Sequence, residues 1–212
     1  MIRSSKYSLV LKTGILFCAV LAVWLRCGAP GVSFSFAPLR MYGVLGGLMA
    51  ALYYLLAVLT FAGKGNAVWC PSLKFTVLIS EILIWAVVQF MIPGQFAGAS
   101  GTTLLTQRLL HTVIPLLMLL DWLLFDAHGI LRLYDPLLAL IPPAGYALVI
   151  LFGGVIGWHV PSPYWFMNTA NLGTPTALLI VLGLGGGIIG TGYLFYFADR
   201  LLSQVTRNRK RG

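Results

Sequence analysis

Long apolar stretches, separated by short polar or Gly/Pro-rich segments, make up most of this chain of 212 residues. Six of these stretches approach the roughly 20 residues with which an α-helix spans the hydrocarbon core of a bilayer. They lie at about residues 8–27, 41–63, 74–92, 105–126, 136–157 and 173–202. The segments between them are too short for a soluble domain. The pattern therefore predicts an all-α fold, an integral membrane bundle of six transmembrane helices in one domain over residues 1–212, with residues 203–212 as a basic cytoplasmic tail.

Composition favours a membrane protein as well, because hydrophobic residues make up 59% of the chain and charged residues only 9%, unlike ordinary soluble domains. The first stretch follows basic residues, as in a signal peptide, but residues 24–27 (WLRC) lack the small residues of a cleavage site. We therefore expect an uncleaved first helix. Lys12 lies inside it near the inner end, where its long side chain can extend to the lipid headgroups.

Basic residues are distributed unequally between the two sides of the predicted bundle. With both termini in the cytoplasm, only Arg26, Arg40 and Arg108 of the 14 lysines and arginines would lie on the outer side. Cytoplasmic loops are enriched in Lys and Arg, so this orientation in the cell membrane is predicted. The net charge of +9 is then expected to meet anionic lipid headgroups. No nucleic-acid partner is expected.

Neither a metal ion nor another cofactor is expected. The three histidines, His111, His128 and His159, fall on different segments, and the chain has no zinc-ligand spacing. Residues 185–190 match the pattern GxGxxG. They lie inside the sixth apolar stretch, however, with no preceding strand to form a dinucleotide-binding fold.

Small residues and prolines predict features of the helix packing. Gly183 and Gly187 are four residues apart in the sixth stretch, and such pairs let neighbouring helices approach closely. Pro142 and Pro143 in the fifth stretch each lack a backbone N–H donor, so a kink is predicted there. A kink of this kind leaves room for an interior cavity beside it.

Three ionisable residues lie inside apolar stretches, where a charge is costly and commonly marks a site. His111 and Asp121 belong to the fourth stretch, and Glu81 belongs to the third. At 1.5 Å per residue, Asp121 should lie about 15 Å deeper than His111, too far to orient it. Asp121 and Glu81 are expected at one depth, either on a proton or cation path or each held by a partner such as Lys74. For Asp121 we favour structural anchoring.

Two stretches in the second half of the sequence resemble motifs of a known family of membrane proteins. The run from His111 to Phe125, HTVIPLLMLLDWLLF, followed by His128-Gly129, resembles the fourth-helix signature of bacterial six-helix relatives of the androgen-induced and androgen-dependent TFPI-regulating proteins. Residues 157–166, GWHVPSPYWF, are similar to that family's Tyr-Pro-Tyr-Pro-Phe stretch. The resemblance implies an intramembrane hydrolase class in which a threonine nucleophile and a histidine cleave esters of fatty acids with hydroxy fatty acids.

Of the two implied catalytic residues, only the histidine is present, as His111. Gly43 stands where the resemblance places the threonine, and Gly46 and Gly47 stand where a Ser-Asn pair is expected. Thr76 is a poor substitute, because it should lie roughly 15–20 Å from His111 in depth, whereas a general base needs hydrogen-bond contact with its nucleophile. The candidates for lining a substrate site are Tyr42, Pro115, Met118, Trp158 and Tyr164. The aromatic residues 158 and 164–166 are expected to form an interfacial belt, with lipid access as the alternative.

These observations predict a protein that acts on or binds an acyl-lipid substrate near the outer leaflet around His111. If it is an enzyme, it is a fatty-acid ester hydrolase with His111 as general base. The alternative is a non-catalytic relative that binds a lipid or an apolar small molecule, which Gly43 favours. A third hypothesis is a small ion or proton translocator that uses Glu81 and Asp121. Membrane lipid is the expected partner in each case.

Overall fold

The computed structural model describes residues 5–28, 33–64, 69–92, 94, 96–152 and 162–208, and within these ranges the regular structure is helical. Six helical segments are long and apolar enough to cross a membrane, as predicted. The first three are α1 (Ser5–Gly28), α2 (Tyr42–Lys64) and α3 (Pro71–Phe90). The fourth joins α4 (Gly101–Arg108), a π-helical segment (Leu109–Val113) and α5 (Ile114–Phe125); the fifth joins α6 (Asp135–Leu138) and α7 (Ile141–Phe152); the sixth is α9 (Thr174–Asn208). The chain is therefore all-helical and fits an integral membrane protein.

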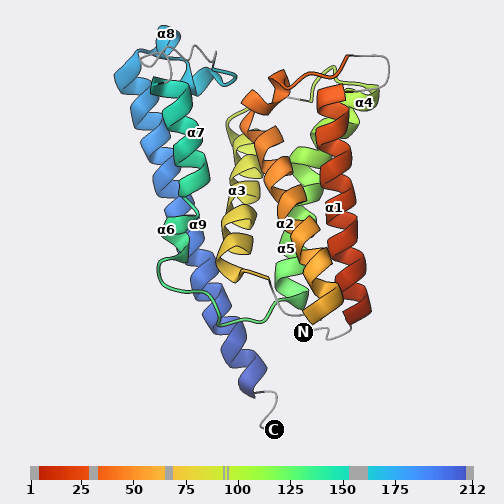
Figure 1. Ribbon diagram of the computed structural model, residues 1–212. Coiled ribbons are helices and arrows are strands. Elements are labelled where there is room, and N and C mark those ends of the chain that lie inside the picture. Colours follow the sequence, from red (N-terminus) through yellow and green to blue (C-terminus); the bar gives the residue numbers. More distant parts are fainter. Residues whose placement is uncertain are drawn as a thin grey trace.

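Short helices connect these segments at one end of the bundle. They are the 3₁₀-helices η1 (Ala37–Arg40) and η4 (Trp165–Met167) and the four-residue helix α8 (Thr169–Leu172). Asn168 caps α8, because its side-chain oxygen accepts hydrogen bonds from the amides of Ala170 and Asn171. The described chain begins and ends at the opposite end of the bundle, as six crossings require (Figure 1).

The helices form two groups on either side of α3 (Figure 1). One group contains α1, α2 and α5, whose apolar core includes Tyr54, Ile114 and Met118 and extends to Leu78 of α3. The other contains α7 and α9, which pack with η4 around Ala147 and Phe166. Over half of the α3 span is buried (56%), against 11% for α9. α3 is thus the central helix, and α9 presents most of its surface to the surroundings.

The predicted kink in the fifth span is present. The helix is interrupted at Ala139 and Leu140, just before Pro142 and Pro143, and regular bonding resumes with the amide of Ala144 donating to the carbonyl of Leu140 over 2.9 Å. The two prolines thus lie in the first turn of α7, where their missing N–H groups cost no helical hydrogen bond.

Two local features differ from a regular helix pattern. Residues 203–208 of the predicted tail continue α9, and the Ser203 hydroxyl donates to the carbonyl of Arg200 over 2.7 Å. The fourth span contains a π turn, in which the amide of Ile114 donates to the carbonyl of Leu109. This turn directly precedes Pro115, which has no N–H to donate to the carbonyl of His111.

Candidate functional site

His111 packs directly against the start of α2. A Cβ atom on Gly43 would lie 2.5 Å from Cε1 and 3.3 Å from Nδ1 of the imidazole, so glycine leaves the space that the ring occupies. The ring also lies near that of Phe96, with centroids 6.2 Å apart and planes 29° from parallel. The position at which the resemblance places a threonine therefore faces the histidine.

The other two glycines of this motif also face neighbouring helices. A Cβ atom on Gly46 would meet the side chain of Ile84 and would lie 2.9 Å from Oε1 of Glu81. A Cβ atom on Gly47 would lie 2.5 Å from a methyl group of Leu110. Each position at which the resemblance implies a polar residue is thus occupied by glycine and filled by a side chain of α3 or the fourth span.

Thr76 lies at the opposite end of the membrane span from His111. It follows Lys74 by two residues, and the Lys74 ammonium bonds Asp121, ten residues beyond His111 along the fourth span. Ten residues correspond to about 15 Å of helix. The structure thus agrees with the depth difference expected from the sequence, and Thr76 does not supply a hydroxyl to His111.

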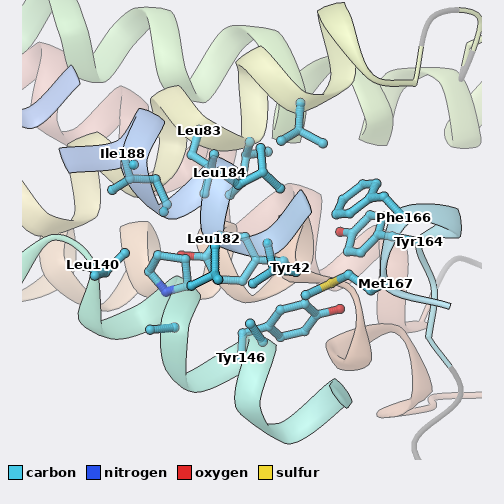
Figure 2. A pocket seen from close by; sticks show the side chains of 18 of the residues that line it. Tyr42, Leu83, Leu140, Tyr146, Tyr164, Phe166, Met167, Leu182, Leu184 and Ile188 are labelled. Carbon is cyan, nitrogen blue, oxygen red and sulfur yellow. The ribbon is translucent and has the colours of Figure 1, made fainter. Parts of the chain in front are cut away.

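A largely apolar cavity of about 290 Å³ lies between α3, α7 and α9 and reaches His111. Its polar lining consists of Tyr42, His111, Tyr146 and Tyr164, and leucine, isoleucine, valine and alanine side chains make up most of the rest. Figure 2 shows Tyr164, Phe166 and Met167 at one end of the cavity and Leu140 and Ile188 toward the other. The break before α7 borders this space through Leu140 and Pro143. An apolar cavity of this size suits a hydrocarbon ligand better than a polar one.

A second cavity of about 220 Å³ lies on the other side of His111. Its polar lining includes Arg26 from the last turn of α1 and Thr106 and Gln107 from α4. His111 and Tyr164 line both cavities. These two side chains therefore lie where the apolar cavity and the more polar cavity come together.

The hydroxyl groups around His111 are bonded within the protein. Tyr42 donates to the Ser80 hydroxyl over 3.2 Å, and Thr106 donates to the carbonyl of Thr102 over 2.7 Å. The Tyr164 hydroxyl accepts a bond from the Gly43 amide at 3.4 Å. Burial raises the pKa of Tyr164, so this hydroxyl keeps its proton and can donate it to a ligand. Thr106 lines the second cavity together with His111, but its hydroxyl bonds a carbonyl of its own helix.

Several residues predicted to line the site lie elsewhere. Pro115 and Met118 are buried in the fourth span but line neither cavity beside His111. The prediction assumed regular α-helical spacing, under which His111 and Met118 share a face; the π turn inserts an extra residue per turn and rotates His111 away from it. Trp158 lies outside the described residues.

The interfacial belt expected from the aromatic residues is present only in part. Trp165 is exposed, whereas Phe166 is buried and lines the apolar cavity with Tyr164. Phe166 therefore does not belong to an exposed belt, whereas Tyr164 is half-buried. Their placement agrees with the alternative, in which these residues lie along a space open to a lipid.

A cluster of charged groups, which we call the charge cluster, lies at the other end of the same span. Asp121 accepts bonds from the ammonium groups of Lys12 at 2.6 Å and Lys74 at 2.5 Å and from the Tyr54 hydroxyl at 2.9 Å. Lys74 also bonds Asp126 at 2.6 Å. Two lysines and two aspartates balance in charge and join α1, α2, α3 and α5. The structural role favoured for Asp121 fits this arrangement.

Two predictions about this region are wrong. Lys12 does not extend to the headgroups, because its buried ammonium bonds Asp121 and the Ser8 hydroxyl. Asp121 and Glu81 do not share a depth, because Glu81 lies against Gly46 whereas Asp121 bonds Tyr54. Positions eight residues apart on α2 differ by about 12 Å in depth. A translocation path that uses the two acids together loses its basis.

Glu81 is the remaining ionisable residue inside a span. It is fully buried, and neither carboxylate oxygen has a hydrogen-bond partner within the described part of the chain. It lines neither of the cavities beside His111. Its contact with the Gly46 position places it one helical turn from Gly43 on α2, but outside the site itself.

Comparison with protein-family models, with curated proteins and with solved structures finds no match for this chain. The fold and the geometry of the site thus carry the functional argument. They define a multi-pass, all-helical membrane protein with a histidine between an apolar cavity and a polar one.

Proposed function

We propose that this protein binds an acyl chain inside the membrane, in the apolar cavity between α3, α7 and α9, with His111 and Tyr164 at its polar end. The observation that carries this proposal is the cavity of about 290 Å³, whose lining is apolar apart from His111 and the tyrosines 42, 146 and 164. Burial of hydrocarbon in such a space is favourable by roughly 25 cal/mol per Å² of apolar surface removed from water. The resemblance to intramembrane lipid hydrolases independently implies an acyl-lipid ligand.

Access from the surrounding lipid is supported by a groove on the outer side of α3 and α9. This groove of about 400 Å³ shares Leu83, Val87, Leu184 and Ile188 with the cavity. These four side chains of α3 and α9 therefore form a wall that separates the cavity from the groove. An acyl chain would enter sideways at this wall, and its polar head would remain near Tyr164.

Ester hydrolysis is the second candidate, because His111 faces the position at which the resemblance places the nucleophile. The site has the base that the resemblance implies, but Gly43 supplies no nucleophilic hydroxyl. A base without a hydroxyl can act only through water. Binding of an acyl ligand thus accounts for more of the site than hydrolysis does.

The cavity can be tested by filling it. Ala147 is buried and lines the cavity, whereas Leu148, the next residue of α7, is exposed and does not. We expect Ala147→Phe to reduce labelling of the purified protein by a photoreactive fatty-acyl probe by about tenfold, which corresponds to ~1.4 kcal/mol. Leu148→Phe is the matched control and should label like the wild type. Equal labelling of all three proteins would contradict the proposal.

A further inference from the structure

The more polar cavity contains a cation without an acidic partner. Arg26 is half-buried in the last turn of α1, and its guanidinium donates a weak hydrogen bond to the sulfur of Met41, at 3.4 Å. A guanidinium carries five N–H donors, and a thioether sulfur is a poor acceptor for any of them. Among the described residues, most of the hydrogen-bonding capacity of Arg26 is thus unused beside the cavity that it lines.

No acidic side chain of the protein is available to Arg26. The sequence contains only five aspartates and glutamates, and all five lie within the described residues. Asp121 and Asp126 bond lysines of the charge cluster. Asp199 pairs with His128, Asp135 accepts from the Arg132 amide, and Glu81 lies against Gly46. The positive charge in this cavity is therefore balanced by no carboxylate of the protein.

The side-chain oxygen of a neighbouring glutamine in the cavity also has no partner among the described residues. The side-chain oxygen of Gln107 is buried, and no described residue bonds it. Buried polar atoms are almost always satisfied, so an unbonded one calls for a ligand or a water. Because the oxygen and nitrogen of a glutamine amide are assigned by their surroundings, this group can turn to donate as well as to accept.

The two cavities together fit one amphiphilic molecule. His111 and Tyr164 line both of them, so a chain in the apolar cavity would carry its head past these two residues toward Arg26. We propose that the ligand has a compact anionic head, a carboxylate or phosphate, which Arg26 binds with help from Gln107 and the Tyr164 hydroxyl. This inference rests on the proposed acyl-chain binding and names the chemical class of the ligand. A planar guanidinium binds either anion through two parallel hydrogen bonds.

The test compares heads on chains of equal length. A saturated fatty acid, an alkyl phosphate and the corresponding fatty alcohol compete with the photoreactive probe for the purified protein. We expect the wild type to prefer one of the anions over the alcohol by about tenfold to a hundredfold, the usual gain from a hydrogen bond to a charged group. The order of acid and phosphate identifies which anion the cavity takes.

Three variants test which side chains produce the preference for an anionic head. Arg26→Gln should lose it while binding the alcohol as the wild type does, which also shows that the variant is folded. Arg108→Gln removes an exposed arginine of α4 that does not line the cavity and should keep the preference. Gln107→Leu changes a second residue proposed to bind the head group. It should weaken binding of the anionic ligand by a few-fold and leave binding of the alcohol unchanged.

The outcomes separate the two proposals. A wild type without any preference overturns the anionic head, and so does a preference that survives both Arg26→Gln and Gln107→Leu. Acyl-chain binding then remains supported if Ala147→Phe still reduces labelling. An equal loss in Arg26→Gln and Arg108→Gln overturns it as well, because general surface charge then explains the effect. Labelling that is insensitive to Ala147→Phe removes the acyl site itself.

Discussion

The fourth span carries two polar regions about 15 Å apart that the protein treats in opposite ways. Around Asp121, each charged group has a partner of opposite sign, and the cavity beside Lys74 and Asp126 measures only about 10 Å³. Around His111, two cavities remain open and Arg26 has no acidic partner. The difference teaches that a buried charge in this bundle does not by itself indicate function. A stronger indication of function is a polar group that lies beside an open cavity and has unused hydrogen-bonding capacity.

The largest effect concerns the orientation of the protein, which should place the His111 region toward the outer leaflet and the charge cluster toward the inner one. The distribution of lysine and arginine predicts that reporters fused at Lys64 and at Gly212 are cytoplasmic, whereas one in the loop containing Gly98 is external. Protease or alkylation accessibility in intact cells checks it. A reporter at Gly98 that is found in the cytoplasm would show that the protein has the opposite orientation. The His111 site would then lie toward the inner leaflet.

Removal of Asp121 should cost far more stability than any change at the other region. In Asp121→Ala, two buried ammonium groups and the Tyr54 hydroxyl lose their acceptor, and an uncompensated buried charge costs about 3–5 kcal/mol. We expect a sharply lower melting temperature of the purified protein. Leu120→Ala, at the exposed neighbouring position, is the control. A melting temperature for Asp121→Ala close to that of the control would show that the cluster is not structural.

Catalysis at the His111 region should be weak or absent in the wild type, because Gly43 supplies no hydroxyl. Gly43→Thr should raise turnover of fatty-acid esters only while His111 is present, so the effects of Gly43→Thr and His111→Ala should be strongly non-additive. The structure adds a condition: the new Cβ would lie 2.5 Å from Cε1, so the ring must move first. Brisk wild-type turnover that persists in His111→Ala would place the chemistry elsewhere.

A smaller effect is expected from Gly43→Ala. The added methyl group must displace the imidazole, which should lower binding of the acyl probe about fivefold, since small overpacking costs on the order of 1 kcal/mol. Gly190→Ala is the matched control, because a Cβ there meets no atom within 4 Å. Unchanged binding in Gly43→Ala would mean that the position of the ring is unimportant to the ligand.

The six spans could be predicted from the sequence because span length is a local property of the apolar pattern. That His111 lies near Gly43 could also be predicted from the sequence. Each residue is near the start of its span, and the alternating directions of the spans place both starts at the same end of the bundle. The charge cluster was not, because the partners of Lys12 depend on how α1 is rotated against α5. Pro115 and Met118 were misplaced by a π turn that periodicity does not reveal. Arg26 has no sequence signal beyond its position at a helix end.

The apolar cavity can be tested most directly by mapping where a photoreactive fatty-acyl probe attaches. Peptide mass spectrometry of the labelled protein should find the adducts on residues of α3, α7 and α9 that line the cavity, such as Val87, Ala147 and Leu184. An excess of unlabelled ligand should remove them. Adducts confined to exposed side chains of α9, such as Leu179 and Leu194, and unaffected by the competitor would contradict an acyl site in this cavity.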